Sequence, residues 1–141
     1  MTTAAIVYHS RTGTTRQFAE EIGDYLAEIG VETRVESVQD CDAASLAGTD
    51  LLLLGCWTSG LFVVLQHPEE SWVEFARRLP RVDHARTALF TTYTLATGSM
   101  FRRMRGHLAG KVGPIELELK SRDGHLQDGH RRALQRLATA P

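Results

Sequence analysis

The sequence predicts a three-layer α/β domain in which helices cover both faces of a doubly wound, five-stranded parallel sheet. Along the chain, short segments that are apolar or that alternate apolar with polar residues are separated by segments of helical periodicity. This is the pattern of domains built from strand–helix–strand units. Three strand segments are continuously apolar and two alternate, which indicates central and edge strands respectively. Placing the second and fifth segments at the edges gives the strand order 2-1-3-4-5.

The five strands differ in how many of their faces are expected to be buried. Ala4–Tyr8, Leu51–Leu54 and Thr87–Tyr93 are apolar throughout and bounded by glycine or polar residues, as fully covered strands are. Val31–Val38 and Ile115–Lys120 alternate apolar with polar residues, which leaves one face partly solvated.

Four helices are predicted between the strands from apolar residues spaced three or four apart. Gly30 is expected to end the first helix, Pro68 to open the second and Ser99 to cap the third, while the fourth spans about Gln127–Ala138. The apolar stripes of these helices are Phe18, Ile22, Leu26 and Ile29; Trp72, Phe75, Ala76 and Leu79; Met100, Met104 and Leu108; and Leu134 and Leu137.

The composition fits one folded domain, expected over residues 1–141, with 43% hydrophobic and 23% charged residues. The net charge of −1 argues against a nucleic-acid partner, because nucleic-acid-binding domains are usually markedly basic. No apolar run approaches the roughly 20 residues of a membrane helix, and no signal-peptide pattern opens the chain. Cys41 and Cys56 imply no disulfide framework. We therefore expect a cytoplasmic protein with no membrane partner.

A cluster of hydroxyl side chains directly follows the first predicted strand. Ser10–Thr15 reads SRTGTT and places four hydroxyl groups and a flexible glycine before the first helix. Helix N-termini attract anions through free N–H groups and the helix dipole. Since four hydroxyls exceed what a helix cap requires, the stretch predicts a cradle for a phosphate monoester.

A second polar loop, Gly55–Leu61 (GCWTSGL), follows the third predicted strand. In a sheet of this order, ligands bind outside the C-terminal strand ends where the strand order reverses, between the first and third strands. Both loops fall at that switch point, so we expect them to form one binding site.

Several other site classes are excluded. Neither G-x-G-x-x-G nor G-x-x-x-x-G-K-[ST] is present. Receiver domains need an acidic pair after the first strand, where His9 and Ser10 stand, and neither cysteine begins the C-x₅-R motif of low-molecular-weight phosphatases. His125 and His130 are not accompanied by further ligands at zinc spacing. We therefore predict no metal site and no catalytic acid or base.

The stretch Ser10-Arg11-Thr12-Gly13-Thr14-Thr15 resembles the flavodoxin phosphate motif [ST]-x-T-G-x-T, and the resemblance spans nearly the whole chain. The uninterrupted strand Ile115–Lys120 is similar to the fifth strand of short-chain flavodoxins. The resemblance implies a flavodoxin-like fold and the cofactor FMN, held by the loops Ser10–Thr15, Cys56–Leu61 and Thr91–Gly98. The cofactor-binding residues that it implies are Ser10, Arg11, Thr12, Gly13, Thr14, Thr15, Cys56, Trp57, Thr58, Ser59, Gly60, Thr92, Tyr93, Thr94, Thr97 and Gly98.

The chain departs from the flavodoxin pattern at two places. The position of the family's stacking aromatic falls at Leu95, which leaves Trp57 and Tyr93 as alternative stacking residues. The run Leu61–Leu65 is apolar where flavodoxins usually carry acids, and it is expected either to form an interface, including self-association, or to fold back as core or an added strand. Basic residues accumulate between Arg77 and Lys111, either as solvated helix faces or as a basic docking area.

The resemblance implies an FMN-binding electron-transfer flavoprotein that cycles its flavin through oxidised, semiquinone and hydroquinone states. Its partners would be a reductase and an acceptor protein, both unidentified. In this resemblance Gly60 permits a peptide flip toward the reduced flavin, because only glycine visits positive φ without steric cost. An FMN-dependent NAD(P)H reductase of a small acceptor and a non-catalytic flavin- or phosphate-binding module remain alternatives. We expect an electron carrier more than an enzyme with its own substrate.

Overall fold

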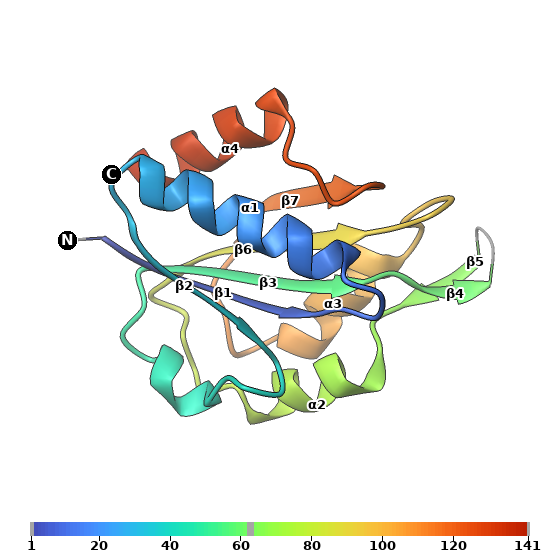
Figure 1. Cartoon of the computed structure of the whole chain (residues 1–141). Coiled ribbons are helices and arrows are strands. Elements are labelled where there is room, and N and C mark those ends of the chain that lie inside the picture. The colour runs from blue at the N-terminus through green and yellow to red at the C-terminus, as the bar shows by residue number, and fades with distance from the viewer. Residues whose placement is uncertain (1, 62–63, 141) are drawn as a thin grey trace.

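A parallel five-stranded sheet lies between two layers of helices in the computed structural model, which describes residues 2–61 and 64–140, with the backbone alone at 59–61 and 64–65 (Figure 1). The strands are β1 (Thr3–His9), β2 (Glu32–Ser37), β3 (Leu51–Trp57), β6 (Arg86–Thr92) and β7 (Ile115–Ser121). Their order is β2-β1-β3-β6-β7, with every neighbouring pair parallel. In chain order this is the predicted 2-1-3-4-5 arrangement, with β2 and β7 at the edges.

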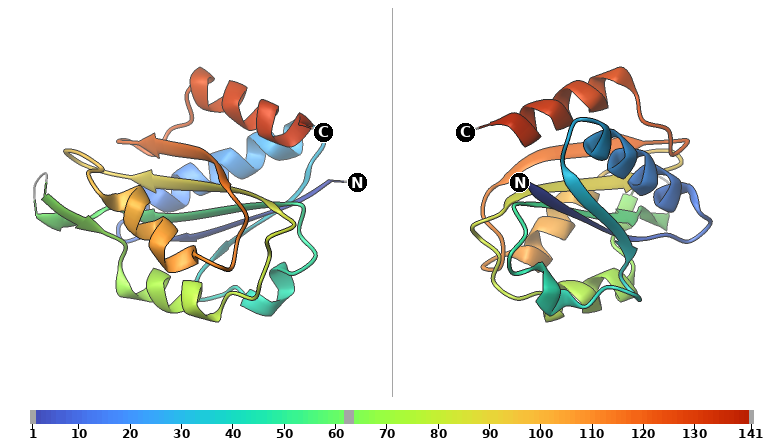
Figure 2. Two further views of the ribbon diagram at one scale, coloured as in Figure 1. Left: turned by 180° about the vertical axis from the view of Figure 1, so that it is seen from behind. Right: turned by 60° about the vertical axis from the view of Figure 1, so that its left-hand side comes forward.

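Helices α1 (Thr14–Glu28) and α4 (Asp128–Thr139) cover one face of the sheet, and α2 (Glu70–Arg78) and α3 (Met100–Leu108) cover the other (Figure 2). A short 3₁₀ helix, η1 (Ala43–Leu46), joins the second layer and was not predicted. The predicted apolar stripes are buried in these layers, apart from the half-buried Ile29.

The central strands are continuously apolar because their alternate side chains enter two different cores. Ile6 and Leu53 pack with Phe18 beneath α1 and α4. Their chain neighbours Val7 and Leu52 instead pack with the residues of α2 and α3. Continuous apolarity therefore correctly identified the strands with both faces covered.

The prediction that Ser99 caps α3 is only half right. Ser99 stands at the N-cap position, but its side chain makes no capping hydrogen bond. Its Oγ instead donates to the backbone carbonyl of Gln66 at 2.8 Å. The hydroxyl therefore joins the start of α3 to the segment before α2.

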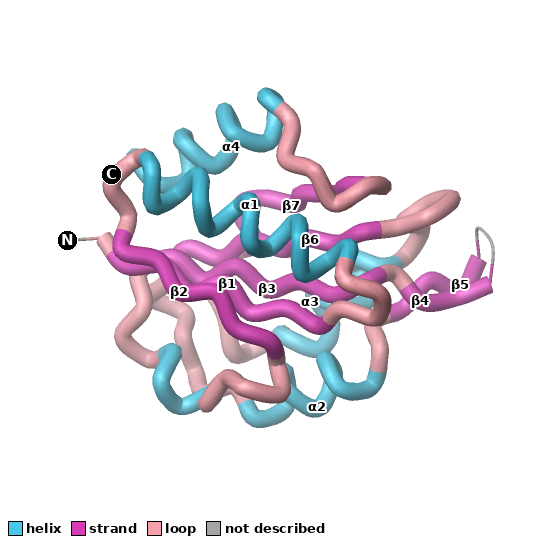
Figure 3. Tube along the Cα trace, viewed as in Figure 1, coloured by secondary structure: helices cyan, strands magenta, loops and turns pink. Residues whose placement is uncertain are grey.

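The segment between β3 and α2 forms an antiparallel hairpin of β4 (Ser59–Leu61) and β5 (Val64–His67). The hairpin extends beyond the C-terminal ends of the parallel strands (Figure 3). Part of the run Leu61–Leu65 thus belongs to added strands, one of the alternatives considered for it, while residues 62–63 lie outside the described part of the chain. Its predicted role as an interface remains a prediction.

Replacing Gly106 by alanine should stabilise the fold. Gly106 is an exposed residue of α3, and a Cβ there would meet no atom within 4 Å. Alanine loses less backbone entropy on folding, so Gly106→Ala should raise the free energy of unfolding by about 0.5–1 kcal/mol in a urea titration.

The matched control lies just beyond the same helix. Gly110 also has open space around it but adopts a φ of +80°, where an L side chain costs roughly 1–2 kcal/mol. Gly110→Ala should therefore destabilise the protein. Two substitutions with the same sign of effect would show that backbone conformation does not decide the outcome.

Candidate functional site

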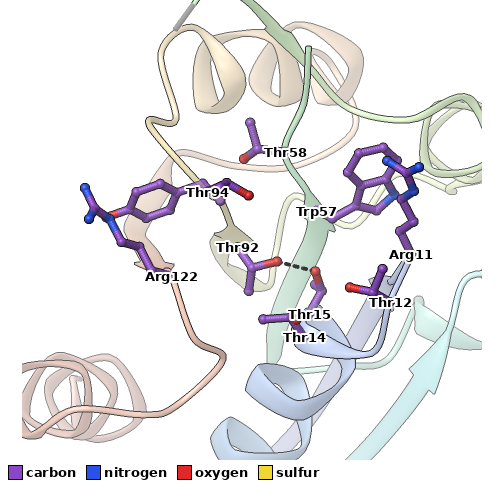
Figure 4. Close-up of a pocket in the computed structure, with 10 residues that line it drawn as sticks. Arg11, Thr12, Thr14, Thr15, Trp57, Thr58, Thr92, Thr94 and Arg122 are labelled. Atoms are coloured by element: carbon purple, nitrogen blue, oxygen red, sulfur yellow. Dashed lines mark hydrogen bonds between the residues drawn. The ribbon is translucent and has the colours of Figure 1, made fainter. Parts of the chain in front are cut away.

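A pocket of about 290 Å³ opens at the C-terminal ends of the strands, where the loops after β1, β3, β6 and β7 meet (Figure 4). The lining residues are Arg11, Thr12, Thr14, Thr15, Trp57, Thr58, Thr92, Tyr93, Thr94 and Arg122. The two predicted loops at the switch point therefore do meet in one cavity, together with residues after β6 and β7.

The loop Ser10–Thr15 presents free backbone donors at the start of α1. Gly13 takes the left-handed conformation, with φ of 98°, and its N–H donates to Ser10 Oγ at 3.0 Å. The first helical bond runs from Gln17 N–H to the Gly13 carbonyl at 2.9 Å. Within the described residues the N–H groups of 14–16 therefore have no partner, and this is the arrangement that binds anions at helix N-termini.

The threonine side chains at the pocket fall into two groups. Thr12 is exposed and Thr14 half-buried, and both line the cavity. Thr15 is instead buried, and its Oγ1 lies 2.5 Å from Thr92 Oγ1, as the dashed line in Figure 4 marks. Thr15 therefore ties the loop to the end of β6, while Thr12 and Thr14 keep hydroxyls available to a ligand.

Further threonine contacts join the ends of β3 and β6 beneath the pocket. Thr58 N–H donates to the Thr92 carbonyl at 2.8 Å, and the hydroxyls of Thr58 and Thr91 lie 2.8 Å apart. Thr91 Oγ1 also donates to the carbonyl of Cys56 at 2.6 Å. These bonds fix the two strand ends that carry Trp57 and Tyr93.

Each aromatic ring of the pocket has a cation over its face. The Arg11 guanidinium lies 5.3 Å from the centre of the Trp57 ring, and the Arg122 guanidinium 5.4 Å from that of Tyr93. Arg11 and Trp57 lie on one side of Thr15, and Arg122 on the other (Figure 4). The indole Nε1 of Trp57 is buried without a hydrogen-bond partner in the described structure.

Cys56 does not present its side chain to the pocket, contrary to the expectation for a loop residue. The strand β3 runs on to Trp57, so that Cys56 continues the alternation of Leu52 and Leu54 into the core under α2 and α3. Burial raises the pKa of its thiol to about 12. The thiol is therefore neutral near pH 7 and supplies no nucleophile.

Other predicted site residues lie around the pocket without lining it. Ser10 and Gly13 shape the first loop, whereas Gly98 packs against the side chain of Gln66. The Thr97 carbonyl accepts the Met100 N–H at the start of α3. Leu95 is 54% exposed and is not a lining residue.

Ser59 and Gly60 fall in β4, where the structure describes the backbone alone. Their predicted contacts to a cofactor therefore remain predictions. The same holds for the peptide flip expected at Gly60.

The sequence prediction missed two residues of the loop after β7. Arg122 lines the pocket, and Gly124, with φ of +82°, lies against the backbone carbonyl of Thr14. Both follow the fifth parallel strand, whose C-terminal end meets the same edge of the sheet as the other strands. The prediction considered three loops, and the topology would have justified a fourth.

The histidines considered as metal ligands serve structural contacts. His130 accepts the Gln127 N–H through Nδ1 at 3.0 Å, and burial holds its pKa below the usual range. His125 Nδ1 lies 3.1 Å from a Glu21 carboxylate oxygen. Within residues 2–61 and 64–140, no set of three or more histidine, cysteine or carboxylate side chains could hold a metal ion.

Comparisons with known proteins agree with this geometry. The family model described as flavodoxin matches residues 6–130. A flavodoxin of Clostridium beijerinckii is 31% identical over 106 residues, which cover 72% of this chain and 75% of that protein.

Solved flavodoxin structures share the fold, as two examples illustrate. Two-electron reduced flavodoxin of Megasphaera elsdenii is 22% identical with a TM-score of 0.75, over 96% of this chain and 97% of that one. A mutant flavodoxin of Fusobacterium nucleatum, bound to flavin mononucleotide, is 17% identical with a TM-score of 0.63, over 82% of this chain and 68% of that one. None of the helices in the described part of the chain has the length and apolarity needed to span a membrane.

Proposed function

Because the chain belongs to the flavodoxin family, we infer that it binds FMN and transfers electrons between redox partner proteins. One observation carries this conclusion for the chain's own residues. The free N–H groups at the start of α1 and the hydroxyls of Thr12 and Thr14 converge on one pocket, and this donor set suits a phosphate dianion.

The residues present fit the parts of FMN. Thr12, Thr14 and the N–H groups of the first turn of α1 would hold the phosphate, and Arg11 adds a positive charge beside them. Trp57 and Tyr93 supply flat apolar surfaces for the ring system. We propose the remaining predicted loop residues as contacts through their backbone.

The cofactor and the protein residues would have different roles in electron transfer. When bound, FMN supplies the redox chemistry by taking up and releasing electrons. The helix N-terminus and the threonine hydroxyls bind and orient the phosphate, and Thr15 with Thr92 fixes the loop that carries them. The aromatic walls exclude water from the ring. We place this activity in the cytoplasm.

Anaerobic reduction separates the carrier from the reductase alternative. Holoprotein mixed with NADPH alone should keep its yellow colour, and addition of a flavoprotein reductase should bleach it. Rapid bleaching by NADPH alone would instead establish a reductase. Protein that binds FMN but whose flavin is reduced under neither condition would support a non-catalytic binding module.

Replacing Trp57 by alanine should identify the stacking wall. If the flavin stacks on Trp57, FMN will quench tryptophan emission in the wild-type protein, and Trp57→Ala will remove most of that change. Loss of the stacking contact should weaken FMN binding by on the order of 1 kcal/mol, in addition to the loss from the apolar surface that is no longer buried.

Trp72 provides the matched control, because it is a fully buried residue of α2 and does not line the pocket. Trp72→Phe should leave the quenching intact. Quenching that survives Trp57→Ala and disappears in Trp72→Phe would show that Trp57 does not meet the flavin.

A further inference from the structure

Three exposed cations lie at the pocket or beside it: Arg11 after β1 and Arg122 after β7 line the pocket, and Lys120 of β7 lies over Tyr93, another lining residue. Arg11 lies over the Trp57 ring, and Lys120 and Arg122 both lie over Tyr93, at 5.8 and 5.4 Å from the ring centre. We call these three side chains the cationic rim. Cation–π contact with the two aromatic rings favours these positions of the cations.

The cationic rim is not neutralised by neighbouring carboxylates. Within the described residues, none of the three cations forms an ion pair. The nearest acid in sequence, Asp123, accepts the His125 N–H at 2.9 Å and the Ser121 hydroxyl at 3.1 Å. Hydrogen bonds to its carboxylate hold the pKa of Asp123 below its usual value, so it stays negative but is turned toward its own loop.

Three basic residues on or beside α2 and α3 have partners within the protein. Arg77 pairs with Glu70 and Glu74, and Arg105 with Glu118. Lys111 Nζ donates to the carbonyl of Ala76 at 2.8 Å. These contacts favour solvated helix faces as the interpretation of the three residues, whereas the cations of the rim lie together at the pocket and have no acidic partner within the described residues.

We propose that the cationic rim is a docking surface for a redox protein that presents acidic side chains around its own redox centre. The proposal rests on the electron-carrier function. The chain carries a net charge of −1, so under this proposal the local field at the pocket is opposite in sign to the charge of the whole molecule. Such a local field steers a complementary surface to the site of transfer. Each electron that leaves the bound, reduced flavin reduces one one-electron centre of the partner, and no group is transferred.

The sign of the local field can be measured on the apoprotein. Trp57 is the half-buried indole at the rim, whereas Trp72 is fully buried. Iodide should therefore quench tryptophan emission at least about threefold more efficiently than caesium at low ionic strength. Arg11→Glu, which replaces the cation over the Trp57 ring, should reverse that order. Equal quenching by the two ions, or stronger quenching by caesium, would overturn the proposal.

Electron transfer from the holoprotein supplies the second test, with ferricyanide and hexaammineruthenium(III) as anionic and cationic one-electron acceptors. Oxidation by ferricyanide should slow about tenfold as salt is added, and oxidation by the ruthenium complex should accelerate. In the double variant Lys120→Glu, Arg122→Glu the salt effects should be reversed: oxidation by ferricyanide should accelerate as salt is added, and oxidation by the ruthenium complex should slow. The control Arg78→Glu with Arg132→Glu makes the same charge change at exposed positions on α2 and α4 and should preserve them.

Two outcomes of the experiment on the holoprotein would overturn the proposal. A ferricyanide rate that rises with salt would show that the net negative charge governs encounter. Reduction by NADPH alone that is lost in the Lys120→Glu, Arg122→Glu variant would assign the rim to a nucleotide. If no yellow complex forms, the carrier function itself fails, and the quenching experiment still decides the charge of the rim.

Discussion

Thr12→Val and Thr14→Val should each weaken FMN binding about ten- to hundredfold while leaving riboflavin binding nearly unchanged. Both hydroxyls line the pocket beside the free N–H groups of α1, and a hydrogen bond to a charged group contributes roughly 1.5–3 kcal/mol. Riboflavin lacks the phosphate and gains nothing from these groups. Fluorescence titration of the apoprotein with both flavins measures the two dissociation constants.

Serine provides the matched control at each position, because it keeps the hydroxyl and loses a methyl group. Thr12→Ser and Thr14→Ser should retain most of the preference for FMN over riboflavin. Valine variants that lose FMN and riboflavin equally would show that the hydroxyls do not contact the phosphate. Neither hydroxyl has a hydrogen-bond partner within the described residues, so no fold defect should obscure the comparison.

Gly124→Ala should both destabilise the protein and impair the phosphate site. Gly124 has φ of +82°, and a Cβ there would lie 2.7 Å from the backbone carbonyl oxygen of Thr14. Left-handed strain costs roughly 1–2 kcal/mol, and crowding a packed backbone adds about 1–3 kcal/mol. Urea unfolding should therefore show a loss of about 2–4 kcal/mol, and displacement of Thr14 should lower FMN affinity by about tenfold or more.

Gly129 is the control for this substitution. It lies in the first turn of α4, the helix that follows Gly124, and a Cβ there would approach no atom closer than 3.9 Å. Gly129→Ala should leave FMN affinity unchanged and should not destabilise the fold. A Gly124→Ala variant as stable as wild type, with normal FMN affinity, would show that the loop after β7 does not support Thr14.

The arrangement of the sheet could be predicted from the sequence because the apolar pattern depends directly on burial. Leu51–Leu54 is apolar at every position because its side chains pack alternately into the two cores. Ile115–Lys120 alternates apolar with polar residues because it forms an edge strand of the sheet. The helix η1 was missed, and the strands of the hairpin β4–β5 were only one of the alternatives left open for their segment. An apolar run such as Leu61–Leu65 fits core, interface or strand equally well, so periodicity could not choose among them.

The site was predictable where its chemistry is local to one stretch of chain. Ser10–Thr15 combines hydroxyls, a glycine and a helix start, and the structure brings these together at the pocket. Cys56 was misplaced because the length of β3 decides its direction, and strand ends are poorly marked in sequence. Arg122 was missed because its role depends on which loops meet in space, which no single segment encodes.

Titration of the purified apoprotein with FMN tests the central claim most directly. The account predicts that one equivalent of FMN binds, with loss of flavin fluorescence and a shifted visible spectrum, and that riboflavin binds at least about tenfold more weakly. Flavin fluorescence and absorption that stay unchanged in excess apoprotein would contradict the claim that this pocket is an FMN site.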